Sequence, residues 1–262
     1  MLKYKVLITT SGIGQRLGDI TQYTNKALVR VGKKPVISYI IESYRKEIEI
    51  VITLGHFGNY IRDFLRLTYP DRCFKFVEID KYKGKGSSLG YSMLKAKDFL
   101  QCPFIYHASD TLINEPIPVP QVNWNGGFPG KESAMYSTYT VMNNHIQQIH
   151  DKGALEYDYI HIGLVGIFQY KIFWNSLAYL YEKDPNDEAL NDCKVINLML
   201  QKKEIFISKV FKSWLDIGNA EGLQKARESI SDKFTNLDKI DESIYIIDRQ
   251  VIKLIHRFCL SL

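Results

Sequence analysis

Two glycines and two basic residues near the start of the chain could bind phosphate. The apolar run Lys5–Thr9 leads into Gly12 and Gly14, and Arg16 and Lys26 follow. A glycine pair after a strand can expose backbone N–H groups to an anion, because glycine lets a ligand approach the main chain. An arginine contacts phosphate through two N–H groups, and a lysine adds a mobile positive charge. The glycines alone are more typical of a tight turn, but the cationic pair favours a polyphosphate ligand.

The segment around these residues continues into two further motifs. Asn-Lys-Ala-Leu-Val occupies 25–29, and Gly-Lys-Lys-Pro-Val-Ile occupies 32–37. Together with the spacing of the glycines and Arg16, these motifs resemble the opening signature of the sugar-nucleotide pyrophosphorylases, which are nucleotidyltransferases of phosphorylated sugars and small alcohols. The resemblance implies that Arg16 and Lys26 are catalytic residues that contact the phosphates of a nucleoside triphosphate.

The resemblance also implies which residues surround the nucleotide. They lie in the first loop and near the start of a later helix: Ser11, Gly12, Gly14, Gly86 and Ser87. The chain departs from the family at Thr10-Ser11, where the family has Ala-Gly, and at Asn25, where the family has proline. Taken by itself, the run 84–89 is equally consistent with a glycine turn and the N-cap of a helix.

Two aspartates stand where a divalent metal ion could bind. Asp110 follows the apolar run Phe104–Ser109, at the carboxyl edge of a predicted parallel sheet, where ligands of open α/β folds bind. Asp216 lies in Trp-Leu-Asp-Ile-Gly at 214–218. Each aspartate alone could equally close a turn or begin a helix. The resemblance implies that both are catalytic and that together they hold Mg²⁺, which prefers oxygen ligands.

Three further residues match positions that contact the acceptor in the family: Lys152, Gly166 and Lys212. The resemblance implies that Lys152 reaches the phosphate and sugar of the acceptor and that Gly166 packs closely against it. Lys212 could add another phosphate contact. Lone lysines are usually exposed to solvent, and for Lys212 this simpler interpretation is favoured.

Apolar runs alternate with segments of helical spacing along the first half of the chain. The predicted strands are Lys5–Thr9, Ile48–Leu54, Phe74–Ile79 and Phe104–Ser109. The spacing of apolar residues between them predicts helices around 36–44, 60–65 and 87–100. This alternation predicts an α/β fold with a mixed, mostly parallel central sheet flanked by helices, which is a Rossmann-like nucleotidyltransferase fold.

The second half of the chain has a more mixed pattern. Pro116–Gly130 is rich in Pro, Gly and Asn and predicts a long surface loop or lid. Asn143-Asn144 between alternating apolar runs predicts an antiparallel hairpin. Helical patterns recur at Lys171–Glu182, Glu188–Lys202 and Asn219–Ser231. We expect a nucleotidyltransferase domain over 1–231 and a C-terminal hairpin or tail over 232–262, which also resembles the start of a small-molecule kinase lobe.

Composition excludes several classes of protein. At 262 residues with 45% hydrophobic content, the chain can bury one full core. The net charge is only +5 and the lysines are scattered, so the sequence shows no basic patch of the kind that binds nucleic acid. No run approaches the roughly 20 apolar residues of a membrane span. The four cysteines and six histidines show no metal-binding spacing, and His107 on a core strand is interpreted as an interior residue. We expect a cytoplasmic protein without nucleic-acid or membrane partners. The sequence leaves open whether the protein forms a homo-oligomer.

The residues and the resemblance together predict an enzyme. It would transfer a nucleoside monophosphate from a nucleoside triphosphate to a phosphorylated sugar or small alcohol phosphate, in the synthesis of a surface-glycan or capsule precursor. A non-catalytic, nucleotide-sugar-binding regulatory subunit is one alternative. A Rossmann oxidoreductase is another, although the spacing of Gly12, Gly14 and Gly18 misses Gly-x-Gly-x-x-Gly by one residue. The chain contains no P-loop kinase motif.

Overall fold

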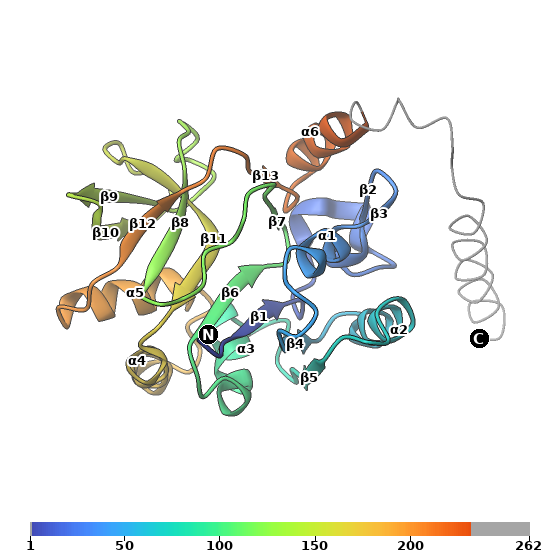
Figure 1. Ribbon diagram of the computed structural model, residues 1–262, viewed down its shortest axis with the longest axis horizontal. Helices are drawn as coiled ribbons and strands as arrows, with labels where there is room; N and C mark the ends of the chain where they lie inside the picture. The colour runs from blue at the N-terminus through green and yellow to red at the C-terminus, as the bar shows by residue number, and fades with distance from the viewer. Residues whose placement is uncertain (1, 232–262) are drawn as a thin grey trace.

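A nine-stranded sheet forms the centre of the molecule in a computed structural model that describes residues 2–231 (Figure 1). From edge to edge, the strands are β5 (Phe74–Glu78), β4 (Ile50–Leu54), β1 (Lys5–Thr9), β6 (Phe104–Ala108), β11 (Tyr159–Ile167), β8 (Trp124–Phe128), β12 (Ile207–Val210), β10 (His145–His150) and β9 (Thr138–Met142). The first four strands are parallel, and β11 runs antiparallel to β6. The predicted α/β fold with a mixed central sheet is confirmed.

Helices cover both faces of this sheet. They are α1 (Val36–Glu42), α2 (Gly58–Thr68), α3 (Leu89–Ala96), α4 (Tyr170–Lys183), α5 (Asp192–Gln201) and α6 (Ala220–Ser231). Successive strand residues point to opposite faces. Val6 and Ile8 therefore pack with α1, α2 and α6, whereas Leu7 packs with α3, α4 and α5. Burial on both faces explains why β1, β4 and β6 are nearly continuous apolar runs.

Short elements connect the layers. Two small two-stranded sheets lie outside the main sheet: β2 (Arg30–Val31) with β3 (Lys34–Pro35), and β7 (Thr111–Leu112) with β13 (Leu215–Asp216). The 3-10 turns are η1 (Gln15–Thr21), η2 (Lys26–Leu28) and η3 (Lys97–Phe99). The helix predicted over 87–100 is thus divided between α3 and η3, and the other predicted helices are present with boundaries moved by a few residues.

The predicted loop over Pro116–Gly130 is wrong in its second half. Residues 124–128 form β8, which lies between β11 and β12 in the middle of the sheet. The glycines that suggested a loop are needed there because of close packing. A Cβ on Gly127 would overlap the hydroxyl of Tyr139, and one on Gly126 would stand 2.7 Å from the carbonyl oxygen of Leu164. Composition alone cannot separate such a strand from a loop.

The predicted hairpin at Asn143-Asn144 is confirmed. These residues join β9 to β10, and their φ angles of 50° and 64° are the left-handed values that a two-residue type I′ turn requires. The segment 232–262, predicted as a hairpin, a tail or the start of a kinase-like lobe, lies outside the described residues. Within residues 2–231, no helix has both the length and the apolar character that a membrane span requires.

Candidate active site

The loop after β1 folds tightly around Gly14. This glycine has a φ of +69°, and a Cβ on it would stand 3.0 Å from Cγ2 of Thr21 and 3.2 Å from Cβ of Lys26. The hydroxyl of Thr21 donates a hydrogen bond of 3.1 Å to the Gly14 carbonyl oxygen. Only glycine fits this conformation and this space, so the loop can bring Lys26 close to the end of β1.

Asn25, which replaces the proline of the resembled family, clamps three segments together. Its side-chain amide donates hydrogen bonds of 2.7 Å to the carbonyl oxygens of both Thr10 and His56. Its Oδ1 accepts a bond of 2.9 Å from the N–H of Ala27, and Asn25 is thereby the N-cap of the η2 turn. The Asn25 side chain is fully buried with all three of these bonds made. The clamp fixes the backbone on which Lys26 stands.

The two predicted metal-binding aspartates converge in space. Asp110 follows β6, and the antiparallel pairing of β13 with β7 sets Asp216 opposite Thr111. A Cβ placed on Gly218 would stand 2.9 Å from Asp110 Oδ2, 2.9 Å from Asp216 Oδ1 and 3.2 Å from Arg16 Nη2. Two carboxylates and one guanidinium group therefore surround one small space.

Positive charge acts mainly on one carboxylate of this pair. Lys26 Nζ donates to Asp110 Oδ2 at 2.8 Å. Burial acts to raise the pKa of Asp110, but Lys26 and then Arg16 outweigh burial, and the pKa lies below its usual value. Burial raises the pKa of Asp216, and the negative charge of Asp110 raises it further. A pair of converging, mutually repelling carboxylates is a donor set that fits a divalent cation such as Mg²⁺.

Tyr136 is a site residue that sequence reasoning missed. Its hydroxyl donates to Asp216 Oδ2 at 2.9 Å, and the Asn219 side-chain amide donates to the same oxygen at 2.7 Å. Burial and then the charge of Asp216 raise the pKa of Tyr136, which keeps the phenol protonated as a donor. The Trp214 ring packs edge-on against it with centroids 4.9 Å apart. No local motif marks Tyr136, because only the fold brings it to Asp216.

A cavity of about 450 Å³ opens beside the carboxylates. Five residues predicted from the sequence are among those that line it: Ser11, Gly12, Lys26, Ser87 and Asp110. A Cβ on Gly12 would meet nothing within 4 Å, so this backbone is open to a ligand. Gly86 does not line the cavity, because it is buried with its Cβ position 3.3 Å from the carbonyl oxygen of Pro185, and Gly84 lines the wall instead.

The start of α3 forms another part of the cavity wall. Ser88 Oγ accepts a hydrogen bond of 3.0 Å from the N–H of Tyr91, so Ser88 is the N-cap of α3. The N-cap interpretation of the run 84–89 is therefore correct for Ser88. Ser87 Oγ donates to the carbonyl oxygen of Gly84 at 2.7 Å. The N-terminal end of a helix carries partial positive charge, which favours a phosphorylated ligand in this cavity.

The residues predicted to contact the acceptor lie in different surroundings. A Cβ on Gly166 would overlap the indole of Trp124, so the glycine is needed for packing against this ring, and its acceptor role stays a prediction. Gly163, in the same strand, has a φ of +68° and lies against Ala108. Lys152 is exposed in the turn after β10, and its acceptor role stays a prediction.

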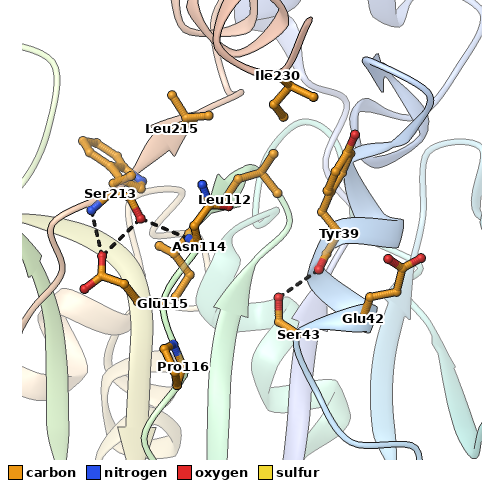
Figure 2. Close-up of a pocket in the computed structure, with 12 residues that line it drawn as sticks. Tyr39, Glu42, Ser43, Leu112, Asn114, Glu115, Pro116, Ser213, Leu215 and Ile230 are labelled. Carbon is orange, nitrogen blue, oxygen red and sulfur yellow. Dashed lines mark hydrogen bonds between the residues drawn. The ribbon is translucent and has the colours of Figure 1, made fainter. Parts of the chain in front are cut away.

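A second cavity, of about 500 Å³, lies at the β7–β13 pair and α1 (Figure 2). Its lining includes Glu115, whose Oε1 accepts hydrogen bonds from the backbone N–H groups of Lys212 and Ser213 at 2.7 and 2.8 Å. Lys212 itself is exposed. Neither Asp110 nor Asp216 lines this cavity. The smaller cavity is therefore the candidate active site.

Comparison with known proteins agrees with this geometry. A choline-phosphate cytidylyltransferase of Streptococcus pneumoniae is 33% identical over 110 residues, which cover 41% of this chain and 45% of that protein. A low-salt glycan biosynthesis nucleotidyltransferase of Haloferax volcanii is 29% identical over 154 residues, 57% of this chain and 42% of that protein. The matches thus span less than half the length of these curated relatives. No protein-family profile matches the chain.

Solved structures extend the likeness to nearly the whole described chain. The structure of a CTP:phosphocholine cytidylyltransferase from Streptococcus pneumoniae superposes with a TM-score of 0.72 at 20% identity, covering 87% of this chain and 100% of that one. The chain has a nucleotidyltransferase fold. The resemblance to nucleotidyltransferases seen in the motifs is confirmed, since the relatives and the structural neighbours are sugar-nucleotide and choline-phosphate nucleotidyltransferases. In this fold, the cavity beside Asp110 lies at the carboxyl ends of the parallel strands, where α/β proteins bind ligands.

Proposed function

We propose that the chain is a nucleotidyltransferase that transfers a nucleoside monophosphate from a nucleoside triphosphate to a phosphorylated sugar or small alcohol phosphate. The convergence of Asp110, Asp216 and Arg16 on one space beside the cavity carries the proposal. The nucleotidyltransferase fold and the names of the relatives support it. A binding subunit would not need two converging carboxylates.

The reaction is a displacement at the α-phosphorus. A phosphate oxygen of the acceptor attacks this atom, the bond to the bridging oxygen breaks, and pyrophosphate leaves with the bonding electron pair. The acceptor phosphate is already ionised near neutral pH, so no general base is required. The chain supplies alignment and charge. Lys26 and Arg16 place positive charge at the carboxylate end of the cavity, and the open backbone at Gly12 borders the phosphates.

Asp110 and Asp216 are the residues that would hold the divalent cation. When bound, Mg²⁺ supplies charge neutralisation for the α-phosphate and for the leaving pyrophosphate. Tyr136 and Asn219 orient Asp216 through the hydrogen bonds to its Oδ2, so the metal ligand would be preorganised before substrate arrives.

The biological role and the acceptor are proposed from the relatives. One of them is named for low-salt glycan biosynthesis, which supports the synthesis of a surface-glycan or capsule precursor. Another is named for choline phosphate, which supports a small alcohol phosphate as acceptor. The exposed Lys152 is the proposed contact to the acceptor phosphate.

Pyrophosphate release tests the proposal. The protein is incubated with Mg²⁺, each of CTP, UTP, GTP, dTTP and ATP, and a panel of sugar 1-phosphates and choline phosphate. We expect release with one pairing of triphosphate and acceptor. D110N and D216N keep the side-chain shape but remove the charge, and each should lower kcat at least about 100-fold. D63N, which changes an exposed aspartate on α2, is the matched control and should retain full activity.

Other outcomes would contradict the proposal in distinct ways. Tight triphosphate binding in calorimetry without pyrophosphate release from any pairing would support the regulatory binding subunit. Turnover that requires a nicotinamide cofactor would support the oxidoreductase. Full activity of D110N or D216N would refute the assignment of the metal ligands even if the enzyme releases pyrophosphate.

A further inference from the structure

A second cluster of chemically active side chains lies between β11 and the start of α5. It consists of His161 on β11 with Asp192 and Cys193, the first two residues of α5. One ligand atom from each lies within 4.8 Å of the others. The side chains of His161 and Asp192 are only 8% and 5% exposed, and Cys193 is 5% exposed. The proposed transfer reaction uses none of these residues.

The imidazole of His161 is held in one tautomer. Its Nδ1 lies 2.9 Å from Oδ1 of the fully buried Asn125, whose Nδ2 donates to the carbonyl oxygen of Gly126 at 3.3 Å. Oδ1 is therefore the acceptor, and Nδ1 carries a proton. Histidines that bind metals almost always donate one ring N–H to an oxygen in this way and turn the other nitrogen to the metal. Nε2 of His161 is the nitrogen so turned.

The contact between Nε2 and Asp192 is not an ordinary hydrogen bond. Nε2 lies 3.0 Å from Asp192 Oδ2. This oxygen is nevertheless buried without a hydrogen-bond partner. Two ligands of one tetrahedral Zn²⁺ stand roughly 3.3 Å apart, with each lone pair directed at the ion and not at the other ligand. A separation of 3.0 Å with an unpartnered carboxylate oxygen leaves room for one cation bound by both groups.

We propose that His161, Asp192 and Cys193 form a structural zinc site. A donor set of imidazole nitrogen, carboxylate oxygen and thiolate sulfur suits Zn²⁺, whereas Mg²⁺ prefers oxygen alone. On binding, the thiol of Cys193 releases its proton to solvent. The charges of one thiolate and one carboxylate then balance Zn²⁺, so the buried site is neutral.

The site would join elements that are distant in sequence. It connects the N-terminus of α5 to β11 and, through Asn125, to β8. It is chemically distinct from the Asp110–Asp216 pair, where only oxygen ligands converge. A zinc ion here would stabilise the mixed half of the sheet without taking part in transfer, so this inference stands independently of the proposed function.

Cobalt substitution isolates this site from the active site. The test protein is the full chain with Cys73, Cys102 and Cys259 replaced by serine, which leaves Cys193 as the sole thiol. Added Co²⁺ should give a thiolate-to-cobalt charge-transfer band that saturates at one equivalent, and Zn²⁺ should remove the band. The same protein carrying H161Q keeps the thiol and should lose the band. Zn²⁺ should also raise the melting temperature by roughly 5–10 °C.

Two results would overturn the proposal. One is the absence of the cobalt band and of any zinc retained after dialysis of the folded wild-type protein, which would identify the cluster as a protonated imidazole beside a carboxylate. The other is an unchanged band in H161Q. Zinc retention by the wild-type protein tests the proposal even if a variant fails to fold. D63N is the matched control and should bind zinc as the wild type does.

Discussion

At the scale of single residues, the position of Asp216 depends on neighbours that no motif contains. Its two oxygens accept hydrogen bonds from Tyr136, Asn219 and the backbone N–H of Gly218. A carboxylate so held can meet Asp110 without moving when a cation binds. Groups that orient a metal ligand typically affect metal affinity or activity by about 10- to 100-fold.

Y136F should therefore weaken the response to Mg²⁺. It removes one hydrogen bond from Asp216 and keeps the ring against Trp214, so we expect the Mg²⁺ concentration for half-maximal activity to rise about 10-fold with little loss of folding stability. Y157F is the matched control, because that hydroxyl donates to the carbonyl oxygen of Gly130 and not to Asp216. Equal Mg²⁺ dependence of the two variants would rule out this role for Tyr136.

His107 shows how a buried residue sets pH dependence. Its Nε2 lies 2.9 Å from the carbonyl oxygen of Thr111, and its Nδ1 lies 2.8 Å from the hydroxyl of Tyr44. The carbonyl oxygen can only accept, so Nε2 carries the proton and Nδ1 accepts from the hydroxyl. Burial lowers the pKa of His107 to about 4. This geometry agrees with the interior role predicted for His107.

The folded protein should lose stability in acid because of this residue. Between its ordinary pKa of 6.5 and about 4, the unfolded chain binds a proton at His107 that the folded chain does not. Its contribution is thus fully present above pH 6.5 and falls by up to about 3 kcal/mol as the pH drops to about 4. Chemical denaturation of wild type and H107Q across this range measures the difference. Parallel curves for the two proteins would show that His107 does not contribute.

At the scale of elements, β8 depends on the absence of side chains. A Cβ on Gly127 would overlap the Tyr139 hydroxyl, which hydrogen-bonds Ser208 Oγ at 2.9 Å. G127A should displace this ring and destabilise the fold by about 2 kcal/mol, which lowers the melting temperature by roughly 4–8 °C. G12A is the matched control, because its Cβ would meet nothing within 4 Å. Equal melting temperatures of G127A and G12A would contradict this packing.

At the scale of the whole molecule, ligand and cation should stabilise the fold together. The cavity draws its walls from the loop after β1, the start of α3 and the end of β6. A triphosphate with Mg²⁺ at about 100 times its Kd should raise the melting temperature by roughly 5–10 °C. D216N should keep the shift from the triphosphate alone and lose the part that depends on Mg²⁺. A full Mg²⁺-dependent shift in D216N would exclude Asp216 as a ligand.

The sequence by itself determined much of the parallel half of the molecule. Strands buried on both faces must be apolar throughout, so β1, β4 and β6 are visible as runs, and Asp110 follows from its place after β6. These features depend on neighbours in the chain. The Asn143-Asn144 turn was predictable for the same reason, since two left-handed residues suffice to reverse a strand.

Only the tertiary structure decided which distant groups meet. Asp216 reaches Asp110 because β13 pairs with β7, and Tyr136 reaches Asp216 from a third segment. The loop-like composition of β8 concealed a central strand, and the indole of Trp124 lies where a Cβ on Gly166 would stand. The physical reason is common to all four. Pairing and close packing between remote segments depend on complementary shape across the fold, which leaves no local pattern in the sequence.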